Sequence, residues 1–263
     1  MLGRAWVVGL AIAVLTMAAL ATAITGPARA ERRQYGELVV FLKGGISPQR
    51  LPRGRPAPVA VHLSGGLGTA DGSLLPRVTR IEIGLPAAGS LSTHGLPACT
   101  ARRLRNAKPP KALAACRPSL VGRGSLEAKV VLPGQGPFTV HAGLLLFNAR
   151  VDGRPAILLH AYATEPPIVV VLPFVLRHRR GTFANVLVAD LPAALGPRPR
   201  LARFEMSLSR RYRYRGRSRS YLNASCSVPP AFTGGSFSLA RSTYTLAGGQ
   251  RPEVEIARGC RAI

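Results

Sequence analysis

Short apolar segments with a period of two, separated by glycine and proline, run through the chain from residue 37 to its end. Val59, Val61 and Leu63 fall on one face of an extended segment, and residues 78–83 alternate between apolar and polar. This alternation is typical of strands with one buried face. No stretch keeps a helical period of 3.6 between capping residues, so the pattern predicts a chain built mostly of short strands.

The segments with this pattern are the predicted strands: 37–43, 57–63, 78–83, 126–132, 139–148, 156–162, 168–176, 183–188, 203–214, 218–226, 237–246 and 253–256. Within residues 100–115 we expect no more than a short turn of helix, because Pro109 and Pro110 would end a helix begun at Ala101. Many short strands with very little helix predict a mostly β protein, a β-sandwich of immunoglobulin-like or barrel-like form.

The first thirty residues have the three parts of a secretory signal peptide. A single early charge, Arg4, precedes an apolar stretch from 5 to 23, and the small residues Ala28 and Ala30 end the segment. We therefore expect residues 1–30 to be removed on export. The alternative is an uncleaved membrane anchor at residues 5–28, since about 20 apolar residues suffice to span a bilayer.

Residues 31–263 are predicted to form a single β-rich domain. The alternative is a boundary near residues 191–200, where Pro192, Pro197 and Pro199 fall close together. After the first segment no apolar run is long enough for a membrane-spanning helix.

The chain is strongly basic, with 36 lysine and arginine residues against 11 acidic residues and a net charge of +25. Nearly all of the basic residues are arginine, which GC-rich codon usage alone would also produce. The functional interpretation is attraction to polyanions such as acidic polysaccharides, phospholipid head groups or nucleic acid. Both interpretations stay open at the level of the sequence.

The four cysteines are Cys99, Cys116, Cys226 and Cys260. Four cysteines allow three pairings, and proximity along the chain favours Cys99 with Cys116 and Cys226 with Cys260. Loops of these lengths would stabilise the fold by roughly 3–4 kcal/mol each in the chain-entropy model. A zinc site would need ligands two to four residues apart, and that spacing is absent. We predict two structural disulfides and no metal site.

An arginine-rich segment stands out in the last third of the chain, where residues 198–219 contain nine arginines and one acid, Glu205. Gly216 and its flanking arginines predict the tip of a hairpin. Basic residues interleaved with aromatics grip phosphates and stack on rings, whereas the alternative is a solvated hairpin whose like charges prevent edge pairing. The candidate polyanion-binding residues are Arg210, Arg211, Tyr212, Arg213, Tyr214, Arg215, Arg217 and Arg219.

No catalytic or cofactor motif is found in the sequence. The five histidines (His62, His94, His141, His160 and His178) share no motif, and there is no Gly-x-Ser-x-Gly elbow, Walker loop or His-Glu-x-x-His. We therefore assign no catalytic, cofactor-binding or metal-binding residue, and expect no cofactor and no enzymatic activity.

Several landmarks resemble a group of uncharacterised exported proteins of GC-rich Gram-positive bacteria. These are Asp71-Gly72, Gly95-Leu96-Pro97-Ala98-Cys99, the run from Cys116 to Gly124, the run from Ser220 to Cys226, and Gly259-Cys260. The resemblance implies export and paired cysteines, and it implies no activity and no site.

These observations lead to one hypothesis and two alternatives. The hypothesis is an exported, non-catalytic protein of the cell envelope or extracellular space that binds an anionic polymer or a membrane surface through the arginine-rich hairpin. One alternative is a structural or protein-interaction module for which the charge has no role. The other is a secreted hydrolase with an unrecognised site. Nucleic acid becomes the expected partner only if the chain is not exported.

Overall fold

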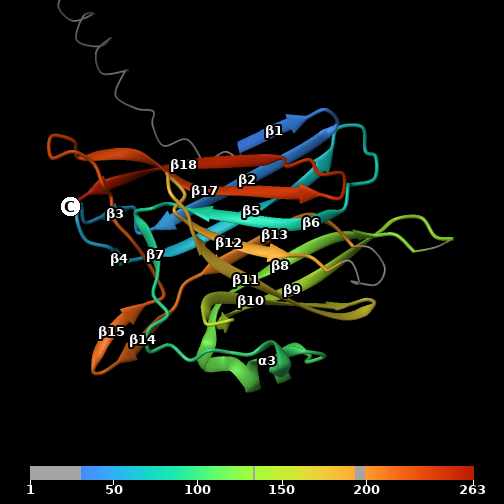
Figure 1. Ribbon diagram of the computed structural model, residues 1–263, viewed down its shortest axis with the longest axis horizontal. Coiled ribbons are helices and arrows are strands. Elements are labelled where there is room, and N and C mark those ends of the chain that lie inside the picture. Colours follow the sequence, from blue (N-terminus) through green and yellow to red (C-terminus); the bar gives the residue numbers. More distant parts are fainter. Residues whose placement is uncertain (1–30, 133, 193–198) are drawn as a thin grey trace, which may run out of the picture.

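A computed structural model describes residues 31–132, 134–192 and 199–263 (Figure 1). The segment predicted to be a signal peptide or anchor lies outside the described residues, as does most of the alternative boundary near 191–200. Across the described ranges, no helix has the length and apolar character needed to cross a membrane.

Thirteen strands of the described chain form one sheet. In order across the sheet they are β1 (Glu31–Tyr35), β2 (Leu38–Ser47), β5 (Ala60–Thr69), β13 (Arg200–Leu208), β8 (Leu120–Val130), β9 (Phe138–Val151), β10 (Arg154–Thr164), β11 (Pro167–His178), β12 (Asn185–Asp190), β6 (Val78–Leu85), β17 (Gly234–Leu246), β18 (Glu253–Ala262) and β3 (Arg50–Leu51). All neighbours pair antiparallel except β18 and β3.

Two smaller sheets and a helical segment complete the fold. The first small sheet pairs β14 (Arg211–Tyr214) with β15 (Arg217–Ser220), and the second has the order β4 (Ala57–Pro58), β16 (Leu222–Ala224) and β7 (Gly89–Leu91). The helical segment contains α2 (Ala101–Leu104), α3 (Pro109–Cys116) and the 3₁₀ turn η1 (Arg117–Ser119). The β14–β15 hairpin projects from the body at the lower left of Figure 1, and α3 lies along its lower side.

The large sheet curls until its two ends meet. Strand β18 lies against β2 and β1. Across this junction Arg258 Nε donates a hydrogen bond to Gly44 O at 2.7 Å, and Tyr35 Oη donates to Glu253 O at 2.8 Å. The mostly β architecture is therefore confirmed, as one curled sheet rather than two separate facing sheets.

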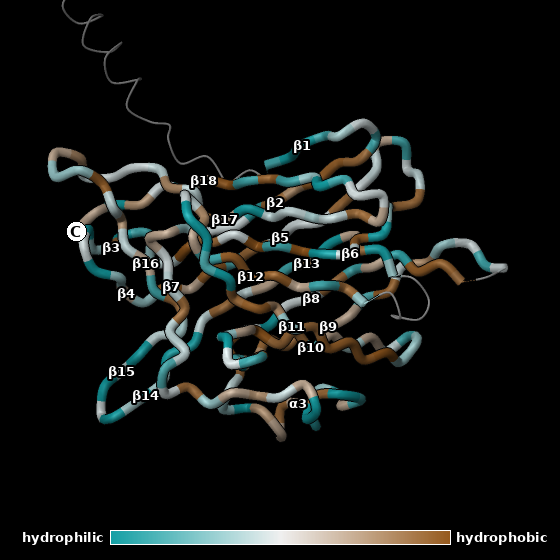
Figure 2. The backbone as a smooth tube through the Cα atoms, viewed as in Figure 1, coloured by the Kyte–Doolittle hydropathy of each residue, from teal (hydrophilic) through white to brown (hydrophobic). Residues whose placement is uncertain are grey.

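The main hydrophobic core fills the inside of the curl. On β2, for example, Val40 and Leu42 point inward and are buried, whereas the next residue, Lys43, points outward and is exposed. This alternation is the period of two expected of a strand with one buried face. Strands β9 and β10 are apolar on both faces, and the tube is accordingly brown along them in Figure 2. Their outer face is covered by the helical segment, where Leu104 packs in a second core with Phe147.

The helical segment and the arginine-rich region differ from expectation. Pro109 and Pro110 begin α3 rather than ending a helix, because a residue at the start of a helix needs no backbone N–H. The strand expected over 203–214 is broken between β13 and β14. The strand expected over 218–226 is likewise broken, because the buried Tyr221 lies between β15 and β16 and belongs to neither strand.

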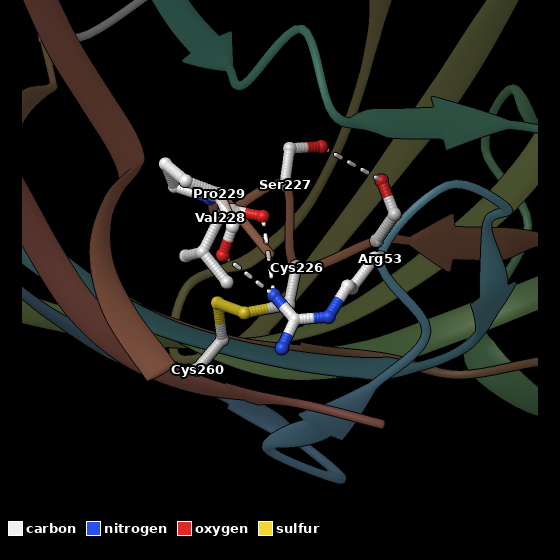
Figure 3. The surroundings of a disulfide bond; sticks show 7 residues. Arg53, Cys226, Ser227, Val228, Pro229 and Cys260 are labelled. Carbon is white, nitrogen blue, oxygen red and sulfur yellow. Dashed lines mark hydrogen bonds between the residues drawn. A yellow bond between two sulfur atoms is a disulfide. The ribbon is translucent and has the colours of Figure 1, made fainter. Parts of the chain in front are cut away.

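Both expected disulfides are present, Cys99–Cys116 and Cys226–Cys260. The first ties the start of the helical segment to its end. The second joins the chain beyond β16 to β18, next to Arg53, whose Nη1 donates to the carbonyls of Val228 and Pro229 at 3.2 and 2.9 Å (Figure 3). Two disulfides are typical of proteins in oxidising compartments.

Candidate functional site

The arginine-rich segment forms a tight β-hairpin. Tyr214 is paired with Arg217, so that Arg215 and Gly216 alone make the turn. Both turn residues have positive φ, 48° and 73°. This combination is typical of a type I′ turn, whose twist matches that of the two strands it joins. The hairpin tip predicted at Gly216 is confirmed.

The tyrosines fix the hairpin to the body of the protein. Tyr212 Oη donates to the carbonyls of Ser92 and His94, at 3.2 and 2.8 Å. The Tyr214 ring meets the His94 ring edge-on at 5.0 Å and covers Gly95, where a Cβ would collide with it. Both rings are half-buried. Their structural role is to hold the hairpin in one orientation, which leaves the arginines to provide the exposed surface.

No carboxylate of the described residues neutralises the arginines of the hairpin through a salt bridge. Arg211, Arg213, Arg215, Arg217 and Arg219 are exposed. Within the described residues, neither these five nor the half-buried Arg210 forms a salt bridge with a carboxylate. Arg215 instead lies 5.4 Å from the centre of the Tyr214 ring. The hairpin therefore presents a concentrated positive surface, seen as a teal hairpin in Figure 2, on a rigid support.

No protein-family model, curated protein or solved structure matches this chain. Its function must therefore be argued from its own residues rather than from its fold.

A group with the composition of a hydrolytic triad lies on the outer face of the sheet. His62 on β5 is the cross-strand partner of Ser207 on β13, and His62 Nδ1 lies 3.0 Å from Ser207 Oγ. Glu205 Oε1 is 3.7 Å from His62 Nε2. The group has no signature in the sequence, because the pairing of β5 with β13 brings together His62 and Ser207, which are 145 positions apart.

The surroundings of this group do not favour catalysis. The His62 and Glu205 side chains are 47% and 49% exposed, so water competes for every hydrogen bond they make. Strand β13 pairs with β5 on one side and β8 on the other, which engages its backbone N–H groups in the ladders. A serine hydrolase needs free donors for the oxyanion beside the nucleophile. We base no function on this arrangement.

The other histidines do not converge on a site. His160 is fully buried, with Nε2 2.7 Å from Ala107 O, where it helps attach the helical segment to β10. His141 is exposed and lies 3.8 Å from Glu127. His94 packs against the hairpin, as described above. In the described residues, no three His, Cys, Asp or Glu side chains are grouped so that they would hold a metal ion.

Glu82 on β6 is the centre of a second charged cluster that the sequence analysis missed. Its side chain is only 8% exposed, and Arg179 donates to both of its oxygens at 2.9 and 3.1 Å. Arg251 and Arg80 approach it to 3.6 and 3.7 Å. Burial opposes ionisation of Glu82, but the hydrogen bonds and charges of these arginines outweigh it, so the pKa of Glu82 lies below its ordinary value.

We expect Glu82→Gln to lower the free energy of unfolding by about 2 kcal/mol at neutral pH, because the arginines lose a charged partner. A carboxylate whose pKa is lower in the folded state stabilises above its unfolded pKa, and this contribution is lost as pH falls through the folded pKa. The difference between wild type and Glu82→Gln should therefore shrink in acid. Urea unfolding at neutral pH and near pH 3 measures both values.

The matched control is Glu37→Gln, which removes the same charge at an exposed position. It should leave stability within about 0.5 kcal/mol of wild type. Equal stability of Glu82→Gln and Glu37→Gln at neutral pH would show that the Glu82 cluster contributes nothing.

Proposed function

We propose that this protein is exported and acts without catalysis at the cell envelope, where the hairpin of residues 210–219 binds a phosphate-bearing anionic ligand. The observation that supports this most directly is the set of hairpin arginines without carboxylate partners. Like charges repel one another, so grouping them costs stability unless an anion neutralises them. Export is supported by the predicted signal peptide and by the two disulfides.

The geometry of the hairpin suits anion binding in a second respect. Guanidinium groups bind phosphate through paired N–H donors, and affinity is lost when the groups must first be ordered. The type I′ turn and the two anchored tyrosines order the hairpin backbone before any ligand arrives. Only the outer parts of the arginine side chains remain to be ordered on binding.

The proposal is tested by binding of the mature protein to inorganic polyphosphate and to vesicles of phosphatidylglycerol mixed with phosphatidylcholine. If the ligand makes three to six phosphate contacts, raising the salt concentration from 50 to 200 mM should weaken binding roughly 20- to 1,000-fold. The triple variant Arg213→Ser, Arg215→Ser, Arg217→Ser should lose most of the affinity and most of the salt dependence.

The control removes the same charge elsewhere. Arg102, Arg103 and Arg105 are exposed on and beside α2, outside the hairpin. Changing these three to serine should reduce binding far less than the hairpin variant does. If both triple variants lose affinity equally, the protein binds through net charge alone and the hairpin is not its site.

A further inference from the structure

The interior of the curled sheet is not completely filled. Two cavities of about 70 Å³ and 130 Å³ lie inside it. Ile83, Leu159, Phe174 and Met206 line both of them, so the two cavities adjoin at these side chains. Protein interiors normally pack to the density of organic crystals, and an empty cavity costs stability in proportion to its volume. Adjoining cavities of this size therefore reduce the stability of the protein unless a ligand fills them.

The lining of both cavities is hydrocarbon. In the larger cavity every lining residue is apolar. In the smaller one Ser90 and Asn223 have polar side chains, and the other lining residues are apolar or glycine. Apolar cavities of this size stay dry and take up apolar guests, because a water molecule finds no hydrogen-bond partners there. The chemistry of the walls suits an alkyl chain and does not suit a sugar or a nucleotide.

The smaller cavity ends beneath the support of the arginine hairpin. Its wall includes Leu91 on β7 and Leu222 on β16, which are paired with each other. The next residues along these strands are joined as well, since Ser92 N donates to Tyr221 O at 2.8 Å. Ser92 O in turn accepts a hydrogen bond from Tyr212 of the hairpin. Three successive contacts thus connect the cavity wall to the hairpin.

The wall of the smaller cavity is most exposed on β7. Ser90 is exposed, and its neighbours Gly89 and Leu91 are half-buried, as are Pro86 and Phe237. An alkyl chain that enters here leaves its polar end on the side of the molecule where β7 and β16 meet the arginine hairpin. The positive surface and the apolar interior are therefore placed to receive the two parts of one molecule.

We infer that the ligand is an anionic amphiphile, a phosphate-bearing lipid that places part of its acyl chain in the interior cavities while the hairpin arginines bind its head group. This inference rests on the proposed function and narrows it from an anionic ligand to a lipid. It also gives the cavities a role, because several methylenes of an acyl chain would fill the volume that the side chains leave empty.

The test uses three probes in calorimetric titrations of the mature protein: lysophosphatidylglycerol, glycerol phosphate as the head group alone, and an uncharged monoacylglycerol as the chain alone. Lysophosphatidylglycerol should bind at least about tenfold more tightly than either part, because each buried methylene adds to the affinity. Equal affinity for lysophosphatidylglycerol and glycerol phosphate would overturn the inference.

Two cavity-filling variants separate the chain from the head group. Leu187→Phe and Leu85→Phe each add bulk to the smaller cavity, from a buried and a half-buried position. Both variants should weaken the binding of lysophosphatidylglycerol and of monoacylglycerol about tenfold or more, and both should leave polyphosphate binding unchanged. Leu187→Ile, which keeps the volume, is the matched control and should bind like wild type. Unchanged lipid binding in both filled variants would exclude the cavity as the binding site of the acyl chain.

The triple arginine variant gives the complementary result. It should lose lysophosphatidylglycerol affinity and keep that for monoacylglycerol. If it binds both as wild type does while the filled variants do not, the cavity takes a chain and the proposed role of the hairpin is wrong. If polyphosphate binding depends on the hairpin but no lipid binding depends on the cavity, the proposed function stands and the lipid is excluded.

A measurement on the unaltered protein guards against misfolded variants. Methyl resonances of Leu91 and Leu222 should shift when lysophosphatidylglycerol is added, because both line the cavity. Those of Leu104, in the outer core beneath the helical segment, should stay in place. Absence of any shift at Leu91 and Leu222 at saturating lipid would overturn the inference.

Discussion

Gly124→Ala is expected to reduce the free energy of unfolding by about 4 kcal/mol or more, or to abolish folding. Gly124 lies in β8, between Met206 of β13 and Leu144 of β9. A Cβ added there would overlap Glu205 O and approach Met206 Cα to 2.9 Å. These are backbone atoms of a strand paired on both sides, which cannot rotate away, so the methyl group can be accommodated only by separating β8 from β13 in the middle of the sheet.

The control for this prediction is Gly143→Ala on the adjacent strand β9. An added Cβ at Gly143 meets no atom within 4 Å, and the residue is exposed. Alanine restricts the unfolded chain more than glycine does, so this variant should be unchanged or more stable by about 0.4–1 kcal/mol. Urea unfolding monitored by circular dichroism measures both. A loss of less than about 1 kcal/mol in Gly124→Ala would mean that the sheet opens easily at this point.

Removal of the Cys226–Cys260 disulfide is expected to have the second largest effect. The bond joins residues 34 positions apart, and both sulfurs belong to the main core. In the chain-entropy model, a loop of this length is worth about 3–4 kcal/mol. The variant Cys226→Ala, Cys260→Ala should therefore lose about that much free energy of unfolding, as measured by urea unfolding. The bond holds β18 at the junction where the sheet closes against β2. The unfolding transition should remain cooperative.

The Cys99–Cys116 disulfide provides the comparison. It closes the helical segment outside the sheet, and its cysteines belong to the outer core. Its loss should expose Leu104 and the amides of α3 to hydrogen exchange while the amides of β2 and β5 keep their protection. If removing Cys99–Cys116 instead reduced protection throughout β2 and β5 as well, the outer core would be part of the same cooperative unit as the main core.

Much of the architecture could be predicted from local pattern. The alternation in 78–83 became β6, and Gly216 lies at the tip of a hairpin. The two disulfides follow the pairing that proximity along the chain favoured. The turn and strand predictions succeed because a period of two and positive φ at a turn are properties of residues next to one another in sequence.

The helical segment shows where local rules were applied too strictly. Proline was expected to end a helix, yet Pro109 and Pro110 begin α3, because the first residues of a helix have no intrahelical partner for a backbone N–H. Strands β9 and β10 are apolar on both faces, and local sequence does not specify what covers their outer face. Their outer cover comes from the helical segment, which is held in place by the Cys99–Cys116 bond and by His160.

The sequence by itself determined the mostly β class, most of the strands and the concentration of arginine in one hairpin, and it favoured the cysteine pairing that is observed. Only the tertiary structure decided the curl of the sheet, the Glu82 cluster, the contact of His62 with Ser207, and the apolar cavities inside the curled sheet. Each of these depends on strand register and on contacts between residues far apart in the chain. Alternation along a strand specifies which face is buried, but it carries no information about which strand lies opposite or how much space the inward side chains leave unfilled.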